Sequence, residues 1–220
     1  MSIQTELTRI KGAKADLQSW VEENGVTVPD GTLIDGLVEL AKTVETGGGG
    51  DDTQIDALID RSITEISNSR VTKIGEYAFY YCKILTTANF PAATSIGGNS
   101  FYSCNSLTTV DFPVATSIGS NAFRGCSSLT TVDFPVATSI GSYAFRDCSS
   151  LTTLILRNPD VVCTLSNTNA FTSTPIASGT GYIYVPSALV DSYKAETNWS
   201  TFADQIRAIE DYPDITGGAA

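Results

Sequence analysis

The 220-residue sequence contains no histidine, the side chain on which most nucleophilic triads and many metal sites depend. It has no Cys-x-x-Cys pair, so no zinc-type ligand cluster is predicted. No apolar run approaches the length of a membrane span, and the first residues lack the basic and apolar regions of a signal peptide. We therefore expect no catalytic residues, no metal, no cofactor and no membrane span.

Basic residues are scarce, because 13 Lys and Arg stand against 24 Asp and Glu for a net charge of −11. The imbalance belongs to the two ends of the chain. Residues 1–60 carry 12 acids and 4 bases, residues 158–220 carry 7 acids and 2 bases, and residues 61–157 carry 5 acids and 7 bases. Phosphate binding needs a basic surface, so nucleic acid is not an expected partner.

Against these absences stands a repeat of 22 residues. Cysteine, isoleucine, glycine, phenylalanine and leucine all recur at this spacing. The cysteines are Cys82, Cys104, Cys126 and Cys148, and the leucines are Leu85, Leu107, Leu129 and Leu151. A period of roughly 20–29 residues with an apolar frame predicts a solenoid, because each unit can bury its apolar face only against the next.

Each unit opens with a predicted strand. The stretch from Leu107 to Pro113 has the apolar-x-x-apolar-x-apolar pattern of a leucine-rich repeat. Because side chains alternate along a strand, Thr109 and Asp111 should face outward. The proline lacks a backbone donor and should end the strand. A second extended piece and a turn then lead to Cys126.

The ends of the array depart from the consensus. Ile63 and Ile66 keep the register, so a degenerate first coil should begin near residue 60. Phe171 follows Phe145 by 26 residues, so the last coil should be expanded or replaced by a cap. Such departures are typical of terminal coils, which have a neighbour on one side only.

The repeated unit also carries a family resemblance. Ser117–Gly119, Ala122–Phe123 and Cys126–Leu129 read Ser-Ile-Gly, Ala-Phe and Cys-Ser-Ser-Leu. This motif resembles the BspA-type leucine-rich repeat over roughly residues 60–157. The resemblance implies a surface-exposed recognition module and does not specify a ligand.

Near the end of the chain, Ile183–Pro186, Tyr193–Ala195 and Asn198–Ser200 are similar to the C-terminal cap that often follows such arrays. We therefore expect an α+β protein: a leucine-rich-repeat solenoid with short parallel strands, N-terminal helices and a C-terminal α/β cap. The expected divisions are a helical attachment and oligomerisation segment (1–46), a Gly-rich linker (47–52), the solenoid with its N-terminal cap (53–157), the C-terminal cap (158–212) and a tail (213–220).

The N-terminal third predicts two helices, separated by Asn24-Gly25 and Pro29-Asp30. Lys14 interrupts a heptad-like seam in the first helix, which otherwise consists of Ile3, Leu7, Ile10, Leu17 and Val21. Two arrangements fit this pattern. The helices can pair as a hairpin within one chain, or the first helix can zip with copies of itself into a homo-oligomer.

A second resemblance covers roughly residues 1–45. Glu6–Ile10, Ala13–Ala15 and Gly25–Pro29 look like the start of many bacteriophage tail and fibre proteins. In such proteins this end attaches a distal module to the virion. They are made in the host cytoplasm and released by lysis, which would reconcile a surface-type repeat with the missing export signal. The resemblance implies location in a virion, the alternative being a bacterial cell surface.

The cysteine column is expected to be buried and reduced. Equivalent atoms of stacked coils lie about 4.8 Å apart, whereas a disulfide needs Cβ atoms about 3.8 Å apart and turned toward each other. In-register cysteines have parallel side chains, so they behave as small buried hydrophobic groups. Cys163 lies outside the column and is left unassigned.

Two outward faces are candidates for binding. The turn face varies between coils and carries Tyr and Arg, which interfaces favour, so we favour it over the regular, small and polar strand face. An equally open interpretation is that the turn residues only tolerate solvent. The candidate residues are Tyr80, Tyr102, Arg124 and Arg146 on the turn face, and Thr109, Asp111, Thr131 and Asp133 on the strand face.

Three functions follow, in decreasing order of support. The first is a non-enzymatic structural and recognition protein, specifically a bacteriophage tail-fibre or receptor-binding component whose partners are a cell-surface protein or glycan and other virion or surface-assembly proteins. The second is an adhesin-like protein of a bacterial cell surface. The third is a carbohydrate-active enzyme that uses Asp111 and Asp133 as a carboxylate pair about 4.8 Å apart. Repetition alone also accounts for that pair.

Overall fold

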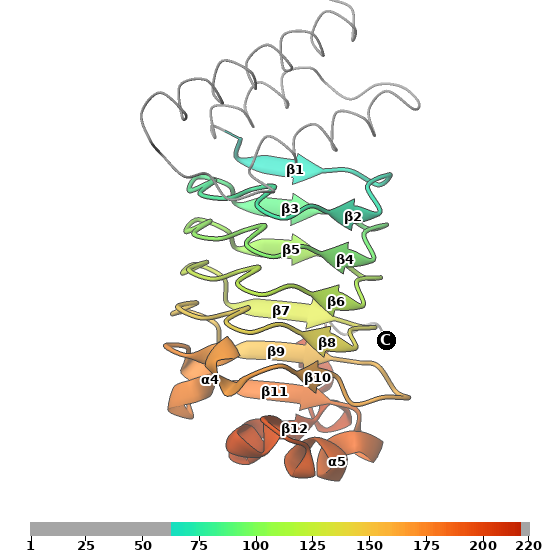
Figure 1. The fold of residues 1–220 in the computed structure, drawn as a ribbon. Helices are drawn as coiled ribbons and strands as arrows, with labels where there is room; N and C mark the ends of the chain where they lie inside the picture. The colour runs from blue at the N-terminus through green and yellow to red at the C-terminus, as the bar shows by residue number, and fades with distance from the viewer. Residues whose placement is uncertain (1–62, 217–220) are drawn as a thin grey trace, which may run out of the picture.

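The computed structural model describes residues 63–216. The predicted N-terminal helices, the Gly-rich linker and any oligomerisation through them lie outside these residues. Within them, each repeat forms one coil with two short strands, and the coils stack (Figure 1). The first strand column contains β1 (Glu65–Ser67), β3 (Thr87–Asn89), β5 (Thr109–Asp111), β7 (Thr131–Phe134), β9 (Thr153–Leu156), β11 (Tyr182–Val185) and β12 (Ile206–Ala208). The second contains β2 (Lys73–Ile74), β4 (Ser95–Ile96), β6 (Ser117–Ile118), β8 (Ser139–Ile140) and β10 (Thr164–Leu165).

All strand pairs are parallel, and their register follows the repeat. Ile66 pairs with Ala88, which confirms the predicted first coil. At the other end Thr164 pairs with Ser139, so this coil is longer than the 22-residue unit, as expected. The stack continues past residue 157, because β11 pairs with both β9 and β12.

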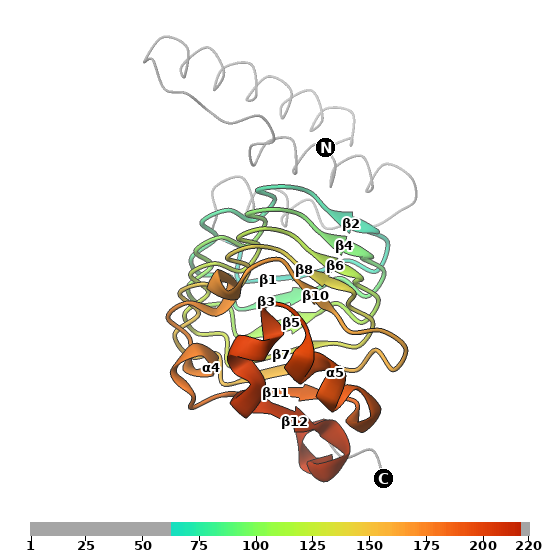
Figure 2. The same ribbon diagram turned by 60° about the horizontal axis from the view of Figure 1, so that its bottom comes forward.

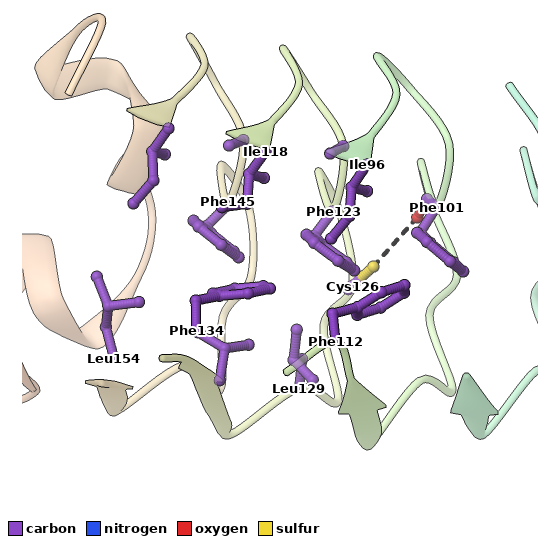
Figure 3. Close-up of a cluster of buried hydrophobic side chains, with 14 of the residues drawn as sticks. Ile96, Phe101, Phe112, Ile118, Phe123, Cys126, Leu129, Phe134, Phe145 and Leu154 are labelled. Carbon is purple, nitrogen blue, oxygen red and sulfur yellow. Dashed lines mark hydrogen bonds between the residues drawn. The ribbon is translucent and has the colours of Figure 1, made fainter. Parts of the chain in front are cut away.

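The core is a ladder of phenylalanines. Phe101 and Phe123 stack with ring centroids 5.2 Å apart and an interplanar angle of 4°. Phe123 and Phe145 repeat this contact at 5.6 Å and 2° (Figure 3). Phe171 extends it from the expanded coil, at 5.7 Å from Phe145. All four rings are fully buried, which confirms the predicted frame.

The cysteines form a second ladder beside the rings. The Cys126 thiol donates to the Phe101 carbonyl of the preceding coil at 3.1 Å (Figure 3). The Cys148 thiol donates to the Phe123 carbonyl at 3.0 Å. All five cysteines are free and buried, as predicted for the column. A thiol suits this position because it is a small apolar group that can still satisfy a buried carbonyl.

A cap of short helices closes the last coil (Figure 2). Trp199 is fully buried, 6.0 Å from Phe171 and 5.5 Å from Tyr193 between ring centroids. Cys163 joins this contact, because its N–H donates to the Tyr193 hydroxyl and its carbonyl accepts from the Trp199 indole. The helical elements are α4 (Pro175–Ser178), α5 (Val190–Ala195) and the 3-10 turns Thr168–Phe171, Ser187–Leu189, Trp199–Gln205, Ile209–Asp211 and Pro213–Thr216.

The first strand column is interrupted between β5 and β7. Strands β1, β3 and β5 form one sheet, and β7, β9, β11 and β12 form another (Figure 1). Val110 of β5 is partly exposed, whereas Val132 of β7 is buried. On the opposite side of the same coils β6 and β8 remain paired. The stack is therefore open on the strand side at this step, and the spacing expected between Asp111 and Asp133 does not apply there.

Ionisation of the buried thiols makes the stability of the coil stack depend on pH. Burial raises the pKa of Cys148 from 9.0 to about 12. The unfolded chain ionises this thiol near its ordinary value, so the native state holds the extra proton between these two values and stability falls as the pH rises through that window. We expect the stability difference between wild type and Cys148→Ala to shrink from about pH 8 to about pH 11. Urea melts at each pH measure it, and a constant difference would contradict the burial argument.

The interruption between β5 and β7 predicts uneven amide exchange along one threonine column. The Thr109 amide donates to Thr86 and the Thr153 amide donates to Thr130, both at 3.1 Å. The Thr131 amide has no partner on β5, because these strands are unpaired. We expect Thr131 to exchange at least about tenfold faster than Thr109 and Thr153. Residue-resolved NMR exchange tests this, with the other two threonines as internal controls, and equal protection of all three would show that the sheet is continuous.

Candidate functional site

Each coil turns through two residues with positive φ, and these residues project from the turn face. Asparagine and glycine adopt this left-handed conformation most readily. The first turn column contains Tyr77, Asn99, Asn121 and Tyr143, with φ values of 58, 55, 56 and 60°. The second contains Tyr81, Ser103, Gly125 and Asp147, with φ values of 60, 57, 76 and 62°.

Tyrosine is an unexpected residue in these columns. A left-handed conformation costs an L-residue roughly 1–2 kcal/mol, because Cβ approaches the following carbonyl oxygen. Tyr77, Tyr81 and Tyr143 adopt it where Asn121 and Gly125 make the same turns elsewhere in the array. The backbone therefore does not require a tyrosine at any of the three positions.

The turn-face side chains form a continuous cluster, which we call the tyrosine–arginine ridge. Tyr80 lies at one end of it, with its ring centroid 5.4 Å from Tyr77, 4.6 Å from Tyr81 and 5.1 Å from Tyr102. The Lys83 ammonium lies 5.5 Å from the Tyr81 ring. The ridge consists of Tyr77, Tyr80, Tyr81, Lys83, Tyr102, Arg124, Tyr143, Arg146 and Asp147.

Arginines continue the ridge across the next two coils. The Arg124 guanidinium lies 5.4 Å from the Tyr102 ring, and its Nε lies 3.4 Å from Asp147 Oδ2. Arg146 approaches the same carboxylate oxygen at 3.5 Å and lies 5.4 Å from the Tyr143 ring. These side chains are partly exposed, so the ion pairs add about 0–1 kcal/mol to stability. Their main effect is to hold the guanidinium groups in place.

The ridge combines uncharged tyrosine side chains with an excess of positive charge. Burial raises the pKa of Tyr80, and the neighbouring hydroxyls of Tyr81 and Tyr102 raise it further. Its hydroxyl therefore stays protonated at neutral pH and can both donate and accept hydrogen bonds. Three cations, from Lys83, Arg124 and Arg146, stand against the single carboxylate of Asp147 within the ridge.

The structure brings together the four turn-face residues predicted from the sequence. Tyr80 contacts Tyr102, Tyr102 contacts Arg124, and Arg124 is joined to Arg146 through Asp147. Sequence reasoning did not identify Lys83 or Asp147 as members. The sequence feature that could have identified them is a charged residue at a turn position.

The strand face is arranged differently. Thr109, Asp111 and Thr131 are exposed as predicted, but Asp133 is partly buried. Its carboxylate accepts from Arg157 through both Nε, at 3.1 Å, and Nη2. Both oxygens of this carboxylate are therefore engaged by one guanidinium. Because β5 and β7 are unpaired and Arg157 binds Asp133, the paired register from which the Asp111–Asp133 spacing was predicted is absent at this step.

Sequence reasoning missed an aromatic cluster on the strand face near the cap. Tyr182 and Tyr184 of β11 extend the columns of Thr153 and Ile155. The Arg207 guanidinium lies 4.7 Å from the Tyr182 ring, and Tyr212 contacts Tyr184 at 5.2 Å. The available signal was the Tyr-Ile-Tyr-Val alternation, which places both tyrosines on one face of a strand.

Residues 63–216 contain no group of three or more Cys, Asp or Glu that could hold a metal ion. Within the same range, none of the helices has the length and apolar character needed to cross a bilayer.

Comparison with known proteins identifies the repeat. A family model described as "BspA type Leucine rich repeat region (6 copies)" matches residues 59–183. Among solved structures, a leucine-rich repeat protein from Bacteroides ovatus matches with 26% identity and a TM-score of 0.47. The match covers 66% of this chain and 34% of that protein, so the chain spans about a third of its length. No curated protein matches this sequence.

Backbone strain at the ridge can be measured by exchanging residues within one turn column. Tyr143 has a φ of 60°, and the two preceding coils carry asparagine at this turn position. Tyr143→Asn should therefore raise the free energy of unfolding by about 0.5–1 kcal/mol. The reverse change, Asn121→Tyr, should lower it by a similar amount. Urea melts of both variants test the prediction, and Asn121→Tyr at wild-type stability would show that tyrosine is not strained there.

Proposed function

Because the chain belongs to the BspA-type leucine-rich repeat family, we propose that its solenoid is a non-enzymatic recognition module that binds its partner through the tyrosine–arginine ridge. The observation that carries this proposal is the continuity of the ridge. Contacts run from Tyr77 through Tyr80, Tyr102 and Arg124 and then through the Asp147 carboxylate to Arg146, and these side chains remain partly exposed.

The chemistry of the ridge suits recognition better than that of the strand face. Tyr and Arg dominate binding hot spots, because they bury large areas and combine apolar surface with directional hydrogen bonds. Arg124 is already oriented by its hydrogen bond to Asp147, so less of its side-chain entropy is lost when it binds. The strand face offers short side chains at Thr109, Asp111 and Thr131, and Asp133 is engaged by Arg157.

The role we propose for this module is the receptor-binding part of a bacteriophage tail fibre, acting on a cell-surface protein or glycan. Support comes from the resemblance of residues 1–45 to tail and fibre proteins, a segment that would attach the solenoid to the virion and assemble it as a homo-oligomer. The second role is that of an adhesin-like protein on a bacterial surface, which is equally compatible with a leucine-rich-repeat recognition module.

Binding of the labelled full chain to intact cells tests the function and separates the two roles. Tyr80→Ala combined with Arg124→Ala should reduce cell binding by at least about tenfold, because both changes remove interface-type side chains. The matched control, Thr109→Ala combined with Asp111→Ala, should bind like wild type. Flow cytometry on bacterial and on animal epithelial cells gives the readout. Bacterial binding supports the fibre role, and epithelial binding supports the adhesin role.

The proposal would be overturned if the ridge variant bound both cell types like wild type. Loss of binding in the strand-face variant alone would place recognition on that face. Thermal melts of both variants should still show cooperative unfolding, since the substituted side chains lie outside the buried core.

A further inference from the structure

The aromatic end of the ridge is a platform rather than a scatter of exposed rings. Tyr80, Tyr81 and Tyr102 contact one another pairwise, with ring centroids 4.6, 5.1 and 5.6 Å apart. All three are partly exposed, so part of each side chain remains accessible to a ligand. Such a platform can pack against an apolar face and hydrogen-bond to a polar rim at the same time.

This platform includes a strained residue. Tyr81 has a φ of 60° in the column where Gly125 makes the same turn. Strained backbone is concentrated at ligand sites, where surrounding structure maintains it. Tyr81 adds the third ring to the platform. The tyrosine therefore enlarges the binding surface and does not relieve the strain of the turn.

The charge beside the platform is positive, although the protein as a whole has a net charge of −11. Lys83 lies over Tyr81 and Arg124 lies over Tyr102. Arg146 adds a third cation. Even if Glu76 beside Tyr77 is counted with Asp147, positive charge remains in excess. An anionic ligand would therefore be drawn to this surface and repelled by the acidic ends of the chain.

The ridge is narrow, and its backbone is already paired. It offers nine side chains, whereas a stable protein–protein interface uses roughly 20–30 residues on each side. The Tyr77 amide donates to Gly98, the Tyr81 amide to Tyr102 and the Ser103 amide to Arg124. At these described ridge positions the amides are therefore not free to pair with an added peptide strand. A narrow polymer that binds through its ring faces and side groups fits this ridge better than a folded protein or a peptide strand.

We infer that the ridge binds an anionic polysaccharide, an assignment that rests on the proposed function. The apolar C–H faces of its sugar rings would stack on Tyr80, Tyr81 and Tyr102. Its carboxylates would pair with Lys83 and Arg124, and the tyrosine hydroxyls would bond to the sugar hydroxyls. The bidentate geometry of a guanidinium makes Arg124 the main reader of the carboxylate.

Polygalacturonate and polysialic acid are suitable probes, with the same polymers in carboxyl-reduced form as neutral controls. Biolayer interferometry with the full chain should show binding to at least one anionic polymer that is at least about tenfold tighter than to its reduced form. Binding should weaken with added salt, because the charges are exposed. Lys83→Gln and Arg124→Gln should each reduce this preference, whereas Lys194→Gln on the cap should leave it unchanged. Tyr80→Ala should weaken binding to both forms.

Three results would overturn the inference: both anionic polymers bind no better than their reduced forms, polyglutamate binds as tightly, or Arg124→Gln keeps the full preference. Polyglutamate binding would indicate an acidic peptide as the ligand. If cell binding still required the ridge, the proposed function would survive these results. If the ridge variants also bound cells like wild type, both proposals would fail.

Discussion

The structure depends on the stacking of coils that cannot bury their own apolar face. Phe123 has a ring parallel to it on either side, and the Cys126 thiol bonds back to the coil before it. Together these contacts fix how far each coil lies from the next and in which register. Side chains 22 residues apart can therefore meet at the turns, as Tyr80 meets Tyr102 and Tyr102 meets Arg124. A ridge of contacts on the surface is the direct consequence of this internal ladder.

The same constraint leaves the turn positions free to vary. Most of the turn amides bond to the next coil whatever side chain they carry, as between Tyr81 and Tyr102 or between Ser103 and Arg124. Since main-chain bonds and buried rings supply the shape, tyrosine, asparagine, arginine or aspartate can stand outside without changing the fold. Recognition can therefore change at the turns while the core stays constant, which is why the variable positions are the informative ones.

The periodic parts of the fold could be predicted from the sequence, because they depend on residues that repeat. The buried cysteines, the first coil at Ile66 and the expanded coil before Phe171 all followed from spacing alone. The opening between β5 and β7 could not be predicted, since residues 107–119 and 129–141 have identical sequences. The neighbours differ: Arg157 reaches back from the next coil to Asp133, and no equivalent arginine faces Asp111 among the described residues. The cluster around Asp147 was equally hidden, because it depends on side-chain orientation.

The ridge and the ladder place opposite demands on the chain. Inside, residues are chosen for fit, and Phe, Cys and Leu repeat almost without change. On the turn face, tyrosines at left-handed positions oppose the preference of the backbone by roughly 1–2 kcal/mol each. The fold can tolerate this backbone strain, because the buried rings of the neighbouring coils stabilise each coil from both sides. Strain is therefore most informative in a repeat protein, where an unstrained copy of the same turn in the next coil shows what the backbone alone requires.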